Sequence, residues 1–236
     1  MLGIDPITVT SLMILAGNAV SCPQAPTTKI NIIPHTEKVK YDYKQSLKKI
    51  QEYSTDTVDP YSFHGTTITQ GFMKGEIGLD HKVTLGQVTN SKRGYSCLWY
   101  KDITVNITID PTIVIAKELY NDRCMRKAII DHELKHVRVD RRVVNKYANL
   151  IGEKLMSDLK TRGFSAGPVR IDSIAEISKK MQRVVNQIIE LEYQKLSIDR
   201  QENQRAVDSL EEYESVDDKC PAFEKKKKQI YSELLR

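Results

Sequence analysis

The spacing of apolar residues changes once along the chain, near residue 120. Before that point, between residues 65 and 109, apolar and polar side chains alternate, most cleanly from Ile103 to Ile109. Alternation with period two is the pattern of strands that bury one face, and it suits an antiparallel sheet whose other face meets water. Shorter elements are expected before this region, namely strands at 29–34 and 39–43 and a helix at 44–53.

After residue 120 the pattern has the period of a helix. A first helix is predicted from 122 to 161, where apolar residues recur every four positions, and a second from 172 to 213, whose apolar residues alternate three and four apart. The short connection contains Gly163, Gly167 and Pro168, so the two helices should pair antiparallel. The predicted fold class is α+β: a small antiparallel sheet with a short helix, followed by a long antiparallel helical hairpin.

These patterns divide the chain into segments, and the first has the features of an export signal. An apolar run is followed by Ala19-Val20-Ser21, which fits a small-x-small cleavage site, although the first 21 residues contain Asp5 and no Lys or Arg. A buried N-terminal segment is the alternative. The expected segments are a signal peptide over 1–21, a linker over 22–28, a β-rich α+β region over 29–120, the hairpin over 121–215 and a charged tail over 216–236.

Composition narrows the expected partners and the compartment. The net charge of +5 is spread along the chain without a basic, aromatic-lined stripe, so no nucleic-acid partner is expected. The four cysteines form no Cys-x-x-Cys pair, and behind an export signal they favour disulfides in a periplasmic or secreted protein. A Cys97–Cys124 bridge would hold the first long helix to the sheet, with free thiols as the alternative. Cys22 is either a lipid-attachment site, which would add a membrane anchor, or a partner for Cys220.

The first long helix carries a His-Glu-x-x-His motif at His132, Glu133 and His136. Positions four apart share one face of a helix, so the two imidazoles can bind a common Zn²⁺. Glu133 can then act as general base toward a zinc-activated water. The other interpretation is a charged helix whose histidines fall one turn apart by chance. Asp140 either orients His136 or forms a surface salt bridge with Arg141 or Lys135.

The pairing of the two long helices indicates where a third metal ligand should lie. With residue 162 placed opposite residue 172, His136 faces residue 198 and His132 faces residue 202. Asp199 and Glu202 are therefore the candidate carboxylate ligands. The alternative is a solvated helix end, where the two form ion pairs with neighbouring arginines.

His132-Glu133-Leu134-x-His136-x-x-x-Asp140 is similar to the active-site helix of thermolysin-type gluzincins, a class of zincin metallopeptidases. A longer resemblance, over 38–205, is to a family of predicted secreted bacterial zinc proteases. Its elements occur here in the same order, namely Tyr41-Asp42-Tyr43, Cys97 before the strand 103–109, the motif helix and Ile198-Asp199. The resemblance implies an exported hydrolase that cleaves peptide bonds, with Asp199 or Glu202 at the acidic position.

Two classes of function therefore follow from the sequence. In the first, a zinc metallopeptidase acts on a peptide or protein, which the strand 103–109 would hold by strand addition if it forms a sheet edge. In the second, the chain is a cell-envelope binding or scaffold protein, its hairpin binds a partner, and its metal site is degenerate or structural. The sequence sets neither the substrate nor the oligomeric state.

Overall fold

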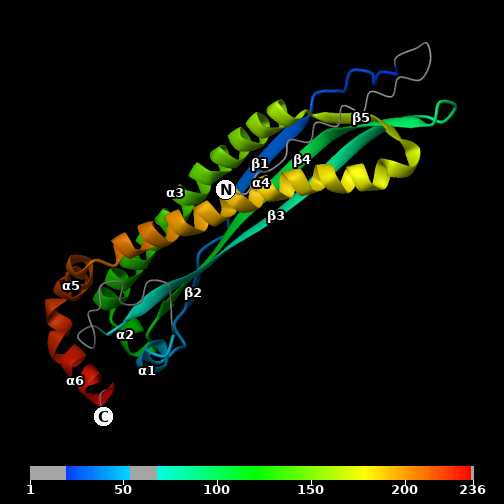
Figure 1. Cartoon of the computed structure of the whole chain (residues 1–236). Helices are drawn as coiled ribbons and strands as arrows, with labels where there is room; N and C mark the ends of the chain where they lie inside the picture. Colours follow the sequence, from blue (N-terminus) through cyan, green and yellow to red (C-terminus); the bar gives the residue numbers. More distant parts are fainter. Residues whose placement is uncertain (1–19, 54–67, 235–236) are drawn as a thin grey trace. The chain divides into compact units, whose positions relative to one another are not determined.

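The structure, a computed structural model, describes residues 20–53 and 68–234 (Figure 1). The signal peptide predicted over 1–21 lies outside the described residues except for its last two. The strands are β1 (Lys29–Thr36), β2 (Lys40–Asp42), β3 (Gly71–Asn90), β4 (Tyr95–Ile115) and β5 (Ser165–Arg170). The helices are α1 (Leu47–Ile50), α2 (Lys117–Tyr120), α3 (Arg123–Arg162), α4 (Ile174–Val207), α5 (Leu210–Asp218) and α6 (Glu224–Leu234), with 3-10 turns η1 (Ile171–Ser173) and η2 (Pro221–Phe223).

The five strands form one sheet in which β4 pairs with each of the other four. β5 runs antiparallel to β4, with Ser96 opposite Val169, but β2 runs parallel to β4, with Tyr41 opposite Ile113. The sheet is therefore mixed, and the predicted antiparallel sheet is wrong. A parallel pair needs a long crossover connection, and α1 and β3, which lie between β2 and β4 in the chain, supply it.

The alternation predicted from Ile103 to Ile109 is confirmed, because the odd-numbered side chains of this stretch are fully buried. They belong to β4, and that strand is at the centre of the sheet rather than at its edge. The expected strand addition of a peptide depended on a sheet edge at 103–109, and that condition is not met. A single turn with Gly94 at φ +69° leads from β3 into β4.

Two compact units share these elements, and each combines strands with helices. Among the described residues, the first unit contains 20–34, 79–107 and 146–194, and the second contains 35–53, 68–78, 108–145 and 195–234. Unlike the segments expected from the sequence, which are continuous, each unit is assembled from several stretches of chain, because the long strands and helices contribute residues to both units.

Each unit contains one disulfide. Cys22 is bonded to Cys97 in the first unit, and Cys124 to Cys220 in the second, so the predicted Cys97–Cys124 pairing is wrong although disulfides are confirmed. Two disulfides indicate an oxidising compartment rather than the reducing cytosol. Among the described residues, no helix combines the length and the apolar composition needed to cross a membrane.

The second unit is built around α3 and extends to the C-terminal helices. Its core joins Phe72, Ile113 and Ile129 to Val216 and Phe223, which lie in the segment predicted to be a charged tail. Val216, Cys220 and Phe223 are spaced four and three residues apart in the sequence, a short apolar stripe within the segment expected to be a charged tail. In the structure Val216 lies in α5, Cys220 in the connection and Phe223 in η2, and all three are buried in this core.

Candidate metal centre

The motif lies on α3, as predicted, and its three functional side chains are buried within the second unit. His132, Glu133 and His136 each expose at most 6% of their surface. One helical turn separates the two imidazoles, whose ring centroids are 5.3 Å apart. Burying two imidazoles and a carboxylate is costly unless they pair or bind a cation, so this helix face is organised around polar chemistry.

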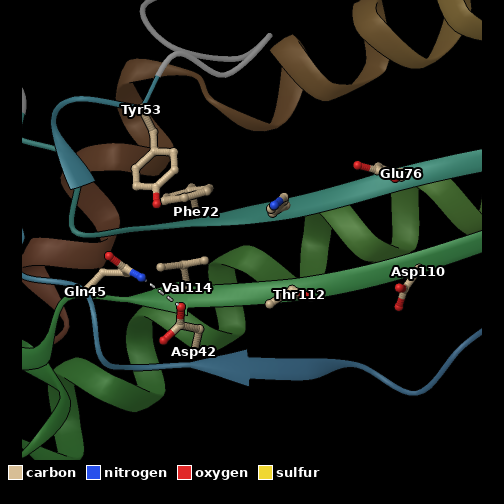
Figure 2. Close-up of a pocket in the computed structure, with 9 residues that line it drawn as sticks. Asp42, Gln45, Tyr53, Phe72, Glu76, Asp110, Thr112 and Val114 are labelled. Carbon is tan, nitrogen blue, oxygen red and sulfur yellow. Dashed lines mark hydrogen bonds between the residues drawn. The ribbon is translucent and has the colours of Figure 1, made fainter. Parts of the chain in front are cut away.

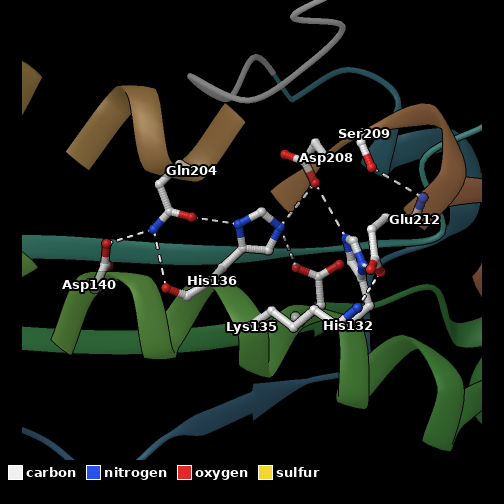
Figure 3. Close-up of polar contacts among 9 residues, drawn as sticks. His132, Lys135, His136, Asp140, Gln204, Asp208, Ser209 and Glu212 are labelled. Carbon is white, nitrogen blue, oxygen red and sulfur yellow. Dashed lines mark hydrogen bonds and ion pairs between the residues drawn. The ribbon is translucent and has the colours of Figure 1, made fainter. Parts of the chain in front are cut away.

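Asp208, the first residue after α4, completes the group. Its Oδ1 atom lies 3.3 Å from His132 Nε2 and 3.0 Å from His136 Nε2 (Figure 3). Zinc–nitrogen distances of about 2.0–2.1 Å in a tetrahedron place neighbouring ligand atoms roughly 3.3 Å apart. The three ligand atoms all lie within 4.8 Å of one another, and the group can hold a metal ion.

Neither carboxylate predicted as the third ligand belongs to this group. Asp199 accepts a hydrogen bond of 2.7 Å from Asn203 Nδ2, and Glu202 is exposed. His136 contacts Gln204 rather than residue 198, so the helix pairing lies six residues further along α4 than predicted. The connection between the helices contains β5, which pairs with β4, so the docking of a strand rather than a tight turn sets the register.

Asp208 has a sequence signal that the prediction of one continuous helix obscured. Ser209 and Glu212 have the spacing of a capping box, and the Ser209 hydroxyl accepts a hydrogen bond of 3.3 Å from the Glu212 N–H. This cap begins α5, so α4 ends immediately before Asp208. A carboxylate at the end of a helix is unfavourable for the helix dipole, which is the kind of local cost expected at a functional site.

The outer nitrogen of each imidazole also faces an acceptor. His136 Nδ1 is 2.5 Å from Gln204 Oε1, and His132 Nδ1 is 3.9 Å from Glu212 Oε2. Glu212 also forms a short ion pair with Lys135. Histidines that bind metals commonly donate their second N–H to such an acceptor, which aims the first nitrogen at the metal. The contact with Gln204 therefore directs His136 Nε2 toward Asp208, whereas the 3.9 Å between His132 Nδ1 and Glu212 is longer than a hydrogen bond.

Asp140 supports the site indirectly. It is fully buried and accepts hydrogen bonds from Gln204 Nε2 at 2.6 Å and from Arg200 Nε at 2.7 Å. The orienting role predicted for Asp140 thus reaches His136 through Gln204 rather than by direct contact. The alternative of a surface salt bridge with Arg141 or Lys135 is wrong, because the partner of this buried carboxylate is Arg200.

Burial and charge act in opposite directions on the titrating groups. Burial raises the pKa of Glu133, and the nearby histidines offset part of this rise. For His136, burial favours the neutral ring, but the bond to Asp208 and the charge of Glu133 outweigh it and raise the pKa to about 9 in the absence of a metal. The pKa of Asp208 is lowered, because its bonds to His132 and His136 outweigh the opposing effect of burial.

Two of the remaining histidines lie in the described residues and contact other groups. His35 pairs with Glu37 at 3.3 Å, and His81 contacts Asn186 at 2.7 Å. Neither belongs to the cluster of His132, His136 and Asp208. His64 lies outside the described residues.

A separate cavity of about 360 Å³ lies in the second unit, and β3 links it to the metal centre (Figure 2). Side chains alternate between the two faces of a strand. Accordingly, Phe72, Lys74 and Glu76 share one face of β3 and line the cavity. The backbone N–H of Met73, which points along the sheet from the same stretch of β3, bonds to Glu133. The cavity contains none of the three candidate ligands, and its lining is predominantly polar.

Comparisons of the chain with known protein families, with curated proteins and with solved structures find no match. The functional assignment therefore depends on the chemistry of the site.

Proposed function

We propose that the protein is an exported zinc-dependent peptidase, with His132, His136 and Asp208 as the metal ligands and Glu133 as the general base. The observation that carries this proposal is the convergence of two imidazole nitrogens and one carboxylate oxygen beside a second buried carboxylate. Zinc suits two nitrogens and one oxygen, and three protein ligands are the number found at catalytic zinc sites, where a fourth position is kept for water.

Glu133 has the location and the environment of a general base. Zn²⁺ bound at such a site lowers the pKa of a coordinated water to about 7 and polarises a carbonyl group. Glu133 Oε2 lies 4.0 Å from His136 Nε2, beside the ligands rather than among them. Burial raises the pKa of its carboxyl group above the ordinary value, which makes the carboxylate a stronger base, so Glu133 can accept a proton from water and pass it to the leaving amine.

Strand β3 is the part of the sheet that we propose to hold an extended peptide. Among the described strands, β3 pairs with β4 alone. Its backbone reaches the site at two points, where the Met73 N–H bonds to Glu133 and the Gly75 carbonyl accepts from Arg200. These two groups are already bonded, so a peptide would add by main-chain hydrogen bonds to the part of β3 beyond them, next to the site. The two disulfides are consistent with a periplasmic or secreted location.

A structural metal site in a cell-envelope binding protein is the second candidate, and one observation favours it. All three candidate ligands and Glu133 are buried, and a structural metal, unlike a catalytic one, needs no position open to water or substrate. In that case the metal would stabilise the packing of α3 against the end of α4, and Glu133 would have no proton to transfer.

Zinc content and peptide hydrolysis, measured on the same preparations, separate the candidates. We expect the purified wild-type chain to bind one zinc ion and to cleave members of a broad peptide library. Glu133→Gln should keep its zinc and lose about 10²–10⁴-fold in hydrolysis, the range of general acid–base catalysis. A wild-type chain without zinc would refute the metal centre, and zinc without cleavage would favour the structural site.

A further inference from the structure

We infer that the cavity lined by β2, β3 and β4 binds a guanidinium or ammonium group carried on an apolar stem. Such a group occurs in free alkyl amines and guanidines and in the side chains of lysine and arginine. The lining shares no residue with the candidate metal centre, and the inference does not rest on the proposed function. At about 360 Å³, the cavity has the size of a small-molecule site.

The cavity lies on the face of the sheet that points away from α3. A Cβ atom added at Gly71 would lie 2.6 Å from Ile129 Cγ2 on α3, so the side of β3 that Gly71 occupies faces this helix. Side chains alternate along a strand, so Phe72, Lys74 and Glu76 point to the opposite face and line the cavity there. A ligand in the cavity is therefore on the other side of the sheet from α3 and its motif.

The two ends of the cavity differ in polarity. Phe72 and Val114 are buried and lie at one end, whereas Glu76 and Asp110 lie at the other (Figure 2). The Tyr53 ring enlarges the apolar end, with its centroid 5.1 Å from that of Phe72. A ligand with an apolar stem and a polar head suits this arrangement, because each part then meets groups of its own kind.

The contacts of Asp110 indicate that the polar head must donate hydrogen bonds. The Asp110 side chain as a whole is 46% exposed, and its Oδ2 atom accepts a hydrogen bond of 2.7 Å from Lys40 Nζ. Its Oδ1 atom is buried, and no hydrogen bond from the residues that the structure describes reaches it. A carboxylate oxygen can only accept, and burying it without a donor is costly. A guanidinium or ammonium group supplies both the donor and the opposite charge.

The charges of the lining favour the same kind of head. One ammonium group, that of Lys74, faces three carboxylates, those of Asp42, Glu76 and Asp110. The Asp42 carboxylate is held in place, because it accepts hydrogen bonds from the Lys44 N–H at 2.9 Å and from Gln45 Nε2 at 3.3 Å. The excess of negative charge attracts a cation and repels an anion. The charge of Lys74 opposes the ligand, so its removal should strengthen binding.

Two pairs of probes test the charge of the ligand and its source. The first pair is n-butylguanidinium and n-butylurea, which have nearly the same shape but differ in charge. The second is a blocked tripeptide with arginine between two glycines, and the same peptide with citrulline. Binding to the full chain is measured by titration calorimetry. In at least one pair the charged member should bind about tenfold more tightly, as expected for a hydrogen bond between charged groups. Binding of the arginine peptide alone would identify a side chain as the source, and binding of n-butylguanidinium would identify a free small molecule.

Three variants of the lining assign the effect to the cavity. Glu76→Gln and Asp110→Asn keep the size of the polar end but remove one charge each, so each should weaken binding of the charged probe about tenfold. Lys74→Gln should strengthen it, a result that damage to the fold would not produce. Glu52→Gln is the matched control, because Glu52 belongs to the same unit and pairs with Lys49 at 2.6 Å but does not line the cavity. Its affinity should match the wild type.

The inference would be overturned by equal binding of the two members of both pairs, or by no binding of any probe. Glu76→Gln and Asp110→Asn that both bind as tightly as Glu52→Gln would also overturn it. None of these measurements involves zinc or peptide hydrolysis, so this inference and the proposed function stand or fall separately.

Discussion

Asp208 is the residue that distinguishes the candidate metal centre in the structure from the one expected from the sequence. Its Oδ1 contacts both histidines, whereas Asp199 bonds to its neighbour Asn203. The helical spacing of apolar residues located the long helices, but it could not show that a carboxylate at the end of the second helix would contact the histidines. The partners of Asp208 and of other buried polar side chains are therefore known only from the structure, and they determine what single substitutions should change.

Replacing Asp208 tests its assignment as the third ligand. Asp208→Ala removes a direct ligand. Its zinc affinity should therefore fall by more than the loss of about 10–100-fold that is typical when a residue bonded to a metal ligand is replaced. Asp199→Ala and Glu202→Ala are the controls, and both should bind zinc like the wild type. Chelator competition measures all three, and a loss of affinity in either control with none in Asp208→Ala would show that the ligand was wrongly assigned.

The environment of Tyr100 predicts how the stability of the protein should change as the pH becomes alkaline. Its hydroxyl is buried and donates to the Met181 carbonyl at 2.8 Å, and burial raises the pKa of Tyr100 from 10.0 to about 12. The folded state therefore holds the proton more tightly than the unfolded state does. This contribution, on the order of 2–3 kcal/mol, is complete below about pH 10 and is lost as the pH rises through about 12.

Denaturant unfolding of Tyr100→Phe at several pH values measures this contribution. Near pH 8 the variant should be less stable by about 1 kcal/mol, because it lacks one buried hydrogen bond. Between about pH 10 and 12 the difference should shrink and then reverse, since the wild type alone loses stability through this group. A difference that stays constant over that range would refute the assigned pKa.

At the scale of elements, the Cys124–Cys220 disulfide holds the helices of the metal centre together. Cys124 lies near the start of α3, and Cys220 follows α5, so the bond encloses both the histidines and Asp208 within one covalent loop. The ion pair between Lys135 and Glu212 adds a second link between α3 and α5. The other disulfide, Cys22–Cys97, encloses none of the ligands.

The two disulfides provide a matched comparison. They close loops of similar length, with sequence separations of 96 and 75, so replacing either pair by serine should cost a similar stability of about 2–5 kcal/mol. Only the loss of Cys124–Cys220 should also weaken zinc binding. Thermal unfolding and chelator competition on both double variants test this, and an equal loss of zinc affinity in the two would contradict it.

At the scale of the whole molecule, metal binding should be coupled to folding. The ligands come from positions as distant in sequence as His132 and Asp208, so the unfolded chain presents no assembled site. Zinc should then raise the unfolding temperature. At a free concentration 100 times the dissociation constant, the added stability is about 2.7 kcal/mol.

Calorimetry with zinc and with a chelator measures this coupling. The unfolding temperature of the wild type should rise with zinc and fall again when a chelator is added. Asp208→Ala should show little of the rise, while Asp199→Ala should respond like the wild type. A zinc-dependent rise of equal size in Asp208→Ala would indicate that zinc acts elsewhere on the protein.

Local features of the protein can be read from its residues alone. The buried strand at Ile103 to Ile109, the helix over 122–161 and the shared face of His132 and His136 follow from periods of two and 3.6 residues, which depend on backbone geometry within a short stretch. Tertiary structure decided the parallel pairing of β2, the two disulfide partnerships and the register that brings Asp208 and Gln204 to the motif. These depend on how distant segments dock, and a shift of six residues along a helix leaves its local pattern almost unchanged while replacing one ligand by another.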